Sequence, residues 1–248
     1  MKMYETSIRL LKTLKLNGMV SKLDELINEA EHKKSSYLNF LHELTRTELE
    51  DRRLRRLKRN LSAAHFPVEK TLELFDFGSI KGIVKSEASN LLECRWIDNH
   101  ENLLFFGPPG IGKTHLAIGF GYQAIEKGYT VCFERMTNLM KILKLANIQR
   151  MAGFRINKIL KSNVLIVDEI GYTPIDRKEA NSFFNLISEL YEKASVVITS
   201  NKSFDEWAEM LGDEVMTTAL LDRLLHHAKL FNLNGKSYRL KDKIKEEK

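Results

Sequence analysis

One short stretch constrains the fold of this 248-residue chain more than any other. Residues 107–114 read GPPGIGKT, which is the pattern G-x-x-x-x-G-K-T, and they directly follow the apolar run NLLFF. A glycine-rich turn between a strand and a helix aims several backbone N–H groups into one concavity, and the helix N-terminus adds positive potential there. The stretch therefore predicts a loop that cradles phosphates between a buried strand and a helix.

The alternative is a glycine-rich loop that matches by coincidence. With glycine near 7% of residues, a chance match in a chain this long has odds of about one in a hundred. We therefore expect a nucleotide here, with Lys113 on the β- and γ-phosphates and the Thr114 hydroxyl on Mg²⁺. The residues expected to contact the nucleotide are Gly107, Pro108, Pro109, Gly110, Ile111, Gly112, Lys113, Thr114 and His115.

A second stretch, NVLIVDEIG at 163–171, carries two adjacent carboxylates at the end of an apolar run. Ligands of open α/β sheets bind at the carboxyl ends of the strands. We expect Asp168 to hold Mg²⁺ and Glu169 to act as the general base for an attacking water. The adjacent glutamate favours hydrolysis over transfer of the phosphoryl group to another substrate.

A third stretch, SVVITSN at 195–201, places polar side chains after another apolar run. Thr199 or Asn201 could orient the attacking water from there. The alternative is that these polar residues cap a strand or the following helix.

The spacing of apolar runs predicts an α/β fold. Short runs at 102–106, 129–133, 164–167, 195–199 and 229–233 alternate with helical patterns, which is typical of a parallel sheet covered on both faces. Residues 1–66 instead carry apolar residues at helical spacing up to the break at Pro67. We expect an all-α N-terminal domain at 1–66 and the α/β domain at 67–248.

The charge balance indicates a polyanionic partner. Residues 1–66 hold 14 Lys and Arg against nine Asp and Glu, and this quarter carries most of the net charge of +6. Net charge informs on partners rather than on fold. The chain has no apolar run of membrane-spanning length and no secretory leader pattern, and its two cysteines lack metal-binding spacing, so we expect a cytoplasmic protein with no membrane partner.

Two basic segments are candidates for DNA contact. Residues 135–161 hold seven Lys or Arg and no acid, and Gly153 is expected to separate two helices there. Within residues 50–60, six of the eight residues at 52–59 are basic. Such helices suit phosphate contacts without base reading, and hence binding that is largely independent of sequence. The expected contacts are Lys141, Lys144, Arg150, Arg155 and Lys158 in the first segment, and Arg52, Arg53, Arg55, Arg56 and Arg59 in the second.

Other partners remain possible for both segments. The insert at 135–161 could be a solvated helical face, although such faces usually mix charges of both signs. The segment at 50–60 could contact an acidic protein or a lipid surface.

The order of these motifs resembles that of the AAA+ ATPases. FPVEKTLELFDF, LIVDEIGY, VITSNKSFDEW and TTALLDRLLHHA, followed by NGKSYRLK, further resemble the IstB family, from Ile8 onward. That family assists the transposase of certain bacterial insertion sequences and is related to the DnaC-type helicase loaders. The resemblance implies a P-loop AAA+ parallel sheet flanked by helices, and DNA-stimulated hydrolysis of ATP with Mg²⁺. It also implies binding to double-stranded DNA and to a cognate transposase.

The resemblance also assigns roles to single residues. Residues 107–114 become the Walker A motif, and Asp168 with Glu169 the Walker B motif. Asn201 becomes the sensor of the water, and Arg223 the arginine finger that reaches the nucleotide of a neighbouring subunit in a homo-oligomer. The alternative for Arg223 is an ion pair with Asp222 or another nearby carboxylate.

The C-terminal segment departs from the family. Lys236 replaces an acid that often precedes Ser-Tyr-Arg there, so Arg239 is not assigned as a second sensor. The chain ends soon afterwards, and we expect no separate C-terminal lid. For His226 and His227 no partner spacing supports a metal site, and helix packing is expected.

Three rival functions stay open at this stage. A helicase loader shares the fold and chemistry and differs in its partner. A small-molecule kinase would use the phosphate loop, but the paired Asp168 and Glu169 argue against it. A non-catalytic DNA-binding module would use ATP only to lock its fold.

Overall fold

The computed structural model describes residues 2–171, 175–235 and 237–238. The chain divides into two compact units, Met1–Arg59 and Asn60–Lys248. Among the described residues, no helix combines the length and apolar character needed to cross a membrane.

The first unit consists of helices: α1 (Lys2–Thr13), α2 (Asn17–Lys33) and most of α3 (Tyr37–Ala64). The start of α2 lies close against α3. A Cβ on Gly18 would stand only 2.7 Å from the Cβ of Asp51, so the glycine permits this approach. The buried Glu48 carboxylate of α3 accepts hydrogen bonds from the backbone N–H groups of Gly18 and Met19, at 2.7 and 3.2 Å. It thereby satisfies donors that a helix N-terminus leaves without partners.

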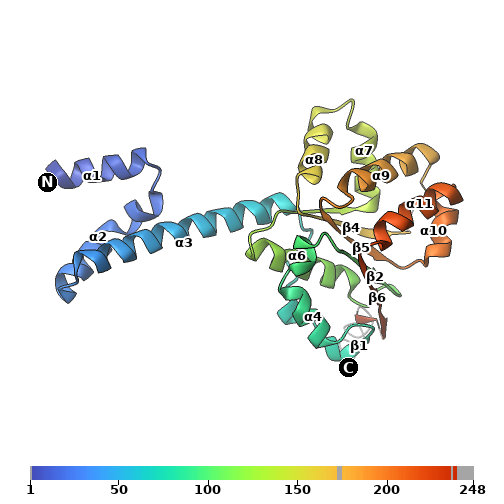
Figure 1. Cartoon of the computed structure of the whole chain (residues 1–248), viewed down its shortest axis with the longest axis horizontal. Helices are drawn as coiled ribbons and strands as arrows, with labels where there is room; N and C mark the ends of the chain where they lie inside the picture. The colour runs from blue at the N-terminus through green and yellow to red at the C-terminus, as the bar shows by residue number, and fades with distance from the viewer. Residues whose placement is uncertain (1, 172–174, 236, 239–248) are drawn as a thin grey trace, which may run out of the picture. The chain divides into compact units, whose positions relative to one another are not determined.

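The second unit contains a five-stranded parallel sheet in the order β3-β4-β5-β2-β6, which confirms the predicted α/β class (Figure 1). Its strands are β2 (Asn102–Phe106), β3 (Val131–Arg135), β4 (Val164–Ile170), β5 (Ser195–Ser200) and β6 (Ala228–Asn232).

Helices cover both faces of this sheet because successive strand residues point to opposite sides. Leu104 and Phe106 of β2 join a core built with α7 (Met136–Leu145), α9 (Arg177–Leu190), α10 (Phe204–Leu211) and α11 (Glu214–Leu225). Phe105 between them stacks on Phe120 of α6 (Lys113–Glu126), with ring centroids 6.1 Å apart. Helix α6, which carries the end of the phosphate loop, is therefore anchored to the face opposite that core.

Two short strands, one before and one after the five-stranded sheet in sequence, pair with each other. Before the sheet lie η1 (Leu72–Leu74), η2 (Phe77–Ser79), β1 (Ile80–Lys81), α4 (Lys85–Leu92) and α5 (Arg95–Asp98), and after it β7 (Asn234–Gly235) pairs antiparallel with β1. The Tyr238 N–H donates to the Gly110 carbonyl at 2.9 Å. The prediction that no separate C-terminal lid follows concerns residues 239–248, which lie outside the described part of the chain.

The basic insert forms two helices, but its break differs from the prediction. Helix α7 ends at Leu145 and α8 spans Arg150–Leu160, so Gly153 lies inside α8 rather than between helices. A Cβ on Gly153 would stand 3.0 Å from the carbonyl oxygen of Ala146. The glycine therefore lets the connection between the helices pass close to α8, and the prediction of a break at this position was wrong.

Candidate nucleotide-binding site

The phosphate loop connects β2 to α6 and adopts a conformation that suits glycine. The φ angles of Gly107, Gly110 and Gly112 are 143°, 78° and 105°. A Cβ on Gly107 would also stand 2.2 Å from the carbonyl oxygen of Leu233. Because α6 begins at Lys113, the unpaired N–H groups of its first turn belong to this loop. The local conformation therefore suits an anion cradle, and phosphate binding by this loop stays a prediction.

Lys113 lies across the mouth of this cradle. Its ammonium donates to the carbonyl oxygens of Gly107 and Pro108 at 2.6 and 2.9 Å. The cationic head is thus held at the start of the loop, within the same turn as the backbone donors.

Asp168 of β4 is buried and lies beside Thr114. Its Oδ1 accepts hydrogen bonds from the hydroxyls of Thr114 at 2.8 Å and Thr199 at 2.6 Å. Its Oδ2 is buried and has no hydrogen-bond partner among the described residues. A carboxylate oxygen without a partner next to a threonine hydroxyl is a donor set that suits Mg²⁺. Thr114 and Asp168 therefore fit the metal that the sequence analysis expects.

Glu169 reaches the same cavity because the sheet is irregular at this point. The register between β4 and β5 shifts between Val167 and Ile170, and Glu169 has a positive φ of 64°. In a regular strand, adjacent side chains would point to opposite faces. The Glu169 N–H donates to the Thr199 hydroxyl at 2.9 Å, and its carboxylate lies 3.8 Å from Nε of Arg135. Thr199 thus bonds to both acidic residues and fixes their relative position.

These residues line a cavity of about 540 Å³. Its wall includes residues 109–115, both acidic residues, Thr199 and Asn201. Oδ1 of Asn201 is buried and has no hydrogen-bond partner in the described structure. Residues 109–115, Asp168, Glu169 and Asn201 are therefore brought together at the carboxyl edge of the sheet, whereas Gly107 and Pro108 are not part of this wall.

Part of this wall was not predicted from the sequence. It consists of the connector residues Pro67–Lys70 and Phe75, together with Arg135 and Tyr238. The connector is joined to the loop through His115, whose Nε2 lies 2.7 Å from the Thr71 carbonyl and whose ring packs edge-on against Phe75. Burial lowers the pKa of His115, more than the Thr71 carbonyl raises it. The aromatic residues of FPVEKTLELFDF were the available signal, because a connector that only spans two domains does not need them.

Arg223 lies apart from this cavity. It is in the last turn of α11, where its guanidinium donates to the Ala219 carbonyl at 2.8 Å and stacks over the Phe184 ring at 4.9 Å. No ion pair of Arg223 with Asp222 occurs among the described residues. The cavity wall of the same chain does not include Arg223.

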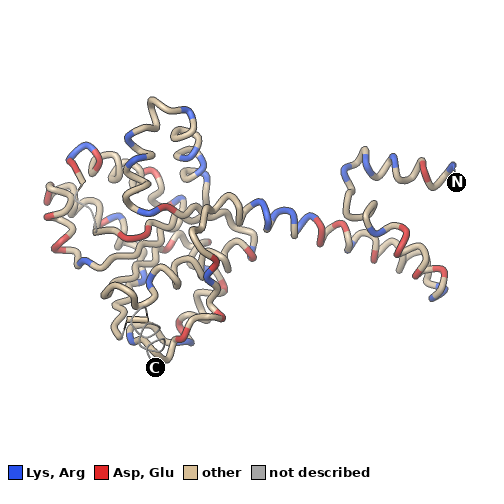
Figure 2. Tube along the Cα trace, turned by 180° about the vertical axis from the view of Figure 1, so that it is seen from behind, with Lys and Arg blue, Asp and Glu red and all other residues tan. Residues whose placement is uncertain are grey.

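The basic insert presents cations along α7 and α8 (Figure 2). Lys141, Lys144, Arg150 and Lys158 are exposed there. These four remain candidates for DNA contact.

Arg155 is a correction to that set. Its side chain is only 10% exposed and pairs with the buried Glu134 at 2.5 Å. The same guanidinium donates to the carbonyl oxygens of Ala63 and Phe133 at 3.1 and 3.0 Å. Its donors are engaged inside the second unit, so Arg155 has a structural role rather than one at the DNA surface.

The arginines near the end of α3 form a second exposed group, and they differ in their pairing. Arg52 and Arg55 pair with Glu48, at 2.7 and 3.6 Å, and Arg55 also with Asp51 at 2.5 Å. Arg53 lies 3.4 Å from Glu50. Arg56 and Arg59 are exposed, and no ion pair of theirs is found among the described residues.

The sheet order, the phosphate loop after β2 and the carboxylates of β4 define a P-loop protein of the AAA+ class. Residues 9–246 match the family described as IstB-like ATP binding protein. The chain belongs to this family.

Curated relatives place this family in bacterial insertion sequences. The chain is 40% identical over 243 residues to the insertion sequence IS21 putative ATP-binding protein of Pseudomonas aeruginosa, which covers 98% of this chain and 91% of that protein. It is 42% identical over 214 residues to the IS5376 putative ATP-binding protein of Geobacillus stearothermophilus, covering 86% of this chain and 85% of that one.

Solved structures support the fold. DnaI superposes with a TM-score of 0.56 and 17% identity, over 67% of this chain and 92% of that one. The DnaC helicase loader superposes with a TM-score of 0.51 and 22% identity, over 71% of this chain and 99% of that one. DnaA from Aquifex aeolicus with bound AMPPCP superposes with a TM-score of 0.54 and 20% identity, over 73% of this chain and 56% of that one.

Proposed function

We propose that this protein is a DNA-dependent ATPase that assembles on target DNA and recruits or activates a transposase. The observation that carries the proposal is the environment of the two β4 carboxylates. Among the described residues, one buried oxygen of Asp168 has no hydrogen-bond partner, and it lies beside Thr114. Glu169 faces the same cavity from a more exposed position. Their burial therefore suits two different roles, one in holding a metal and one in activating water.

The residues of the cavity would divide the chemistry of hydrolysis among them. Bound Mg²⁺, held by Thr114 and Asp168, would neutralise charge on the phosphate oxygens. Lys113 and the N–H groups of the loop bind the phosphates. Glu169 accepts the proton of the attacking water, and the side-chain amide of Asn201 orients that water.

The proposal includes an ATP site shared between subunits. A positive charge near the transferred phosphoryl group lowers the barrier, and Arg223 is absent from the cavity wall of its own chain. Arg223 of one subunit would therefore act on the nucleotide of its neighbour, which links hydrolysis to assembly.

The DNA-binding part of the proposal rests on charge. The exposed cations of α7 and α8 have no acidic residue between them in the sequence, and α3 ends in a second basic group. Lys and Arg that neutralise phosphates release counterions, so affinity should fall steeply with salt and vary little with base sequence.

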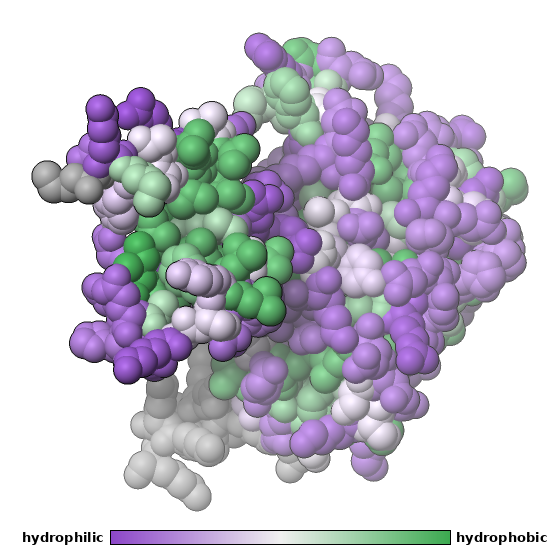
Figure 3. Space-filling model, turned by 60° about the vertical axis from the view of Figure 1, so that its left-hand side comes forward, coloured by the Kyte–Doolittle hydropathy of each residue, from purple (hydrophilic) through white to green (hydrophobic). Residues whose placement is uncertain are grey.

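The transposase partner is supported by the relatives and by the first unit. Apolar side chains gather on one face of this unit (Figure 3). The exposed large apolar side chains of the unit include Leu10, Leu14 and Leu38, which are 60%, 66% and 74% exposed. Exposed apolar patches of this kind mark protein interaction sites. We assign this face to a protein partner, and the insertion-sequence relatives favour a transposase.

The test is ATP hydrolysis by the tag-free protein with and without duplex DNA of several unrelated sequences. The proposal predicts Mg²⁺-dependent hydrolysis that all of the duplexes stimulate at low salt. The proposal would be contradicted by a hydrolysis rate that is unchanged by DNA, or by a rate that only one DNA sequence stimulates.

A replicative helicase is the alternative partner, because the fold is shared with the DnaC loader. The two functions use the same ATP chemistry and differ in what the first unit binds. A pull-down with a transposase of an IS21-type insertion sequence and with a replicative helicase separates them. Retention of the helicase alone would favour the loader.

A further inference from the structure

We propose that Glu192, His226 and His227 form a binding site for one divalent transition-metal ion of the Zn²⁺ class. Each of the three side chains offers one ligand atom, and these atoms all lie within 4.8 Å of one another. The sequence gives no sign of this site, because Glu192 precedes the histidine pair by more than 30 residues.

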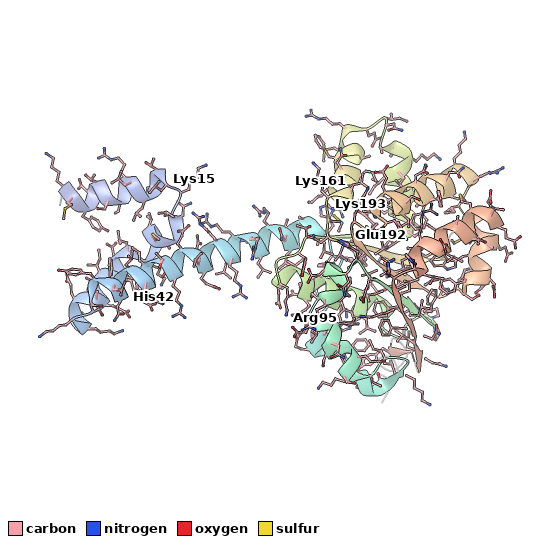
Figure 4. The ribbon with its side chains drawn as sticks, in the orientation of Figure 1. Lys15, His42, Arg95, Lys161, Glu192 and Lys193 are labelled. Atoms are coloured by element: carbon pink, nitrogen blue, oxygen red, sulfur yellow. The ribbon has the colours of Figure 1, made fainter. Side chains whose placement is uncertain are left out.

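The fold brings the three residues together at the edge of the sheet opposite the nucleotide. Glu192 lies in the turn between α9 and β5 (Figure 4), His226 directly follows α11, and His227 directly precedes β6. Strands β5 and β6 both begin there, whereas the nucleotide cavity lies at their carboxyl edge. The proposed site is therefore distinct from the place of Mg²⁺.

A neighbouring tyrosine contacts one of the ligands. The Tyr191 hydroxyl lies 2.7 Å from Nδ1 of His226. The rings of His226 and His227 stand 4.1 Å apart. Outer partners of this kind fix ring orientation in metal sites. Tyr191 is thus an outer partner of His226 through Nδ1.

The donor set selects the class of ion. Two imidazoles and one carboxylate suit Zn²⁺, Co²⁺ or Ni²⁺, whereas Mg²⁺ and Ca²⁺ prefer oxygen ligands only. Three protein ligands leave a fourth position open for water. All three residues are exposed, so an ion reaches them without any opening of the structure.

The charges near Tyr191 are mixed. Glu192 and Asp222 both act on Tyr191 as negative charges. Arg223 is the opposing positive group, and its guanidinium is placed over Phe184. A bound ion would join the α9–β5 turn to the α11–β6 turn and so tie two elements that are distant in sequence.

The first test is direct titration of the tag-free full chain with Zn²⁺ by calorimetry and with Co²⁺ by visible absorption, without nucleotide. We expect one equivalent to bind and the unfolding temperature to rise with Zn²⁺. Glu192→Gln and His227→Ala should each weaken binding about 10- to 100-fold or more.

His42→Ala is the matched control, because His42 is an exposed histidine on α3 of the other unit (Figure 4). It should bind Zn²⁺ as the wild type does. Unfolding of each variant without metal, followed by circular dichroism, separates loss of a ligand from loss of the fold. The proposal is overturned if the wild type shows no saturable binding, or if folded Glu192→Gln and His227→Ala both bind Zn²⁺ with unchanged affinity.

Discussion

At the scale of single residues, Asp168 and Glu169 are neighbours in sequence with different surroundings. Asp168 is 1% exposed and bonded to two hydroxyls, whereas the Glu169 side chain is 38% exposed. A buried carboxylate with one oxygen that accepts no hydrogen bond is suited to bind a metal ion. A carboxylate open to the cavity is suited to accept a proton from a reacting water. The division follows from the irregular register of β4 and β5.

Glu169→Gln tests the role of the general base. The amide cannot accept the proton, so hydrolysis should fall by about 10²- to 10⁴-fold while ATP still binds. Single-turnover hydrolysis and binding of a fluorescent ATP analogue measure the two effects. Glu209→Gln, an exposed change on α10, is the control and should leave both unchanged. Full hydrolysis by Glu169→Gln would remove Glu169 from the mechanism.

Thr199→Val tests the link between the two carboxylates. The valine removes the donor to Asp168 and leaves the buried N–H of Glu169 without its acceptor, which should cost about 1–3 kcal/mol of unfolding free energy. Urea unfolding and steady-state hydrolysis measure the change. Thr199→Ser keeps the hydroxyl and should retain most of the activity; equal loss in both variants would refute a role for the hydroxyl.

The sequence predicts which residues belong to this site, but it predicts few of the contacts between them. The motifs name Thr114, Asp168 and Asn201, because phosphate and metal chemistry requires particular residue types at strand ends. Whether Arg223 faces a neighbour stays a prediction. The contact of Arg135 with Glu169 could not be predicted, since it depends on the register of two strands and on a residue in a left-handed conformation.

At the scale of elements, α8 carries two kinds of basic residue. Arg155 faces inward and ties α8 to β3 and to the last turn of α3, while Lys158 faces solvent. The charge pattern alone treats them alike. Their difference depends on which side of α8 packs against the sheet. The prediction placed a helix break at Gly153, so it did not identify the buried side of α8.

Arg155→Ala and Lys158→Ala should therefore separate stability from DNA binding. Removing one partner of a buried ion pair leaves Glu134 without its cation, so Arg155→Ala should lose about 3–5 kcal/mol of stability. Lys158→Ala should keep its unfolding temperature and weaken DNA binding, with a shallower salt dependence. Thermal unfolding and fluorescence anisotropy at several salt concentrations measure both. A stable Arg155→Ala with weakened DNA binding would reverse the correction.

The contact of α2 with α3 should depend on pH through Glu48. Burial raises its pKa, but Arg52 and the N–H groups of Met19 and Gly18 outweigh this, so the pKa is lowered from 4.5. A lowered carboxyl pKa gives stability that is present above the unfolded value and lost as pH falls through the folded value. The unfolding temperature of the first unit should drop below about pH 4.5.

Glu48→Gln should be less stable at neutral pH and should lose part of this acid dependence. Glu43→Gln, an exposed change on the same helix, is the control. Identical acid profiles for the wild type and Glu48→Gln, measured by circular dichroism during heating, would contradict the assignment.

At the scale of the whole molecule, the alternation of apolar runs was enough to predict the parallel sheet and its class. All five predicted runs overlap strands of the sheet. Four of them are buried strands, which are apolar on both faces, whereas β6 is mostly exposed. The pairing of β1 with β7 could not be predicted, since these two-residue strands have no periodicity to detect. The partner of the first unit stays a proposal, and its exposed apolar face is the surface to examine.

The ATP site is proposed to be completed by a second subunit. Hydrolysis should be measured in the presence of duplex DNA for Glu169→Gln, for Arg223→Ala and for an equal mixture of the two. We expect each variant to be inactive and the mixture to regain activity, because mixed interfaces pair an intact Glu169 with an intact Arg223. Full activity of Arg223→Ala by itself, or a mixture as inactive as its components, would contradict the shared site.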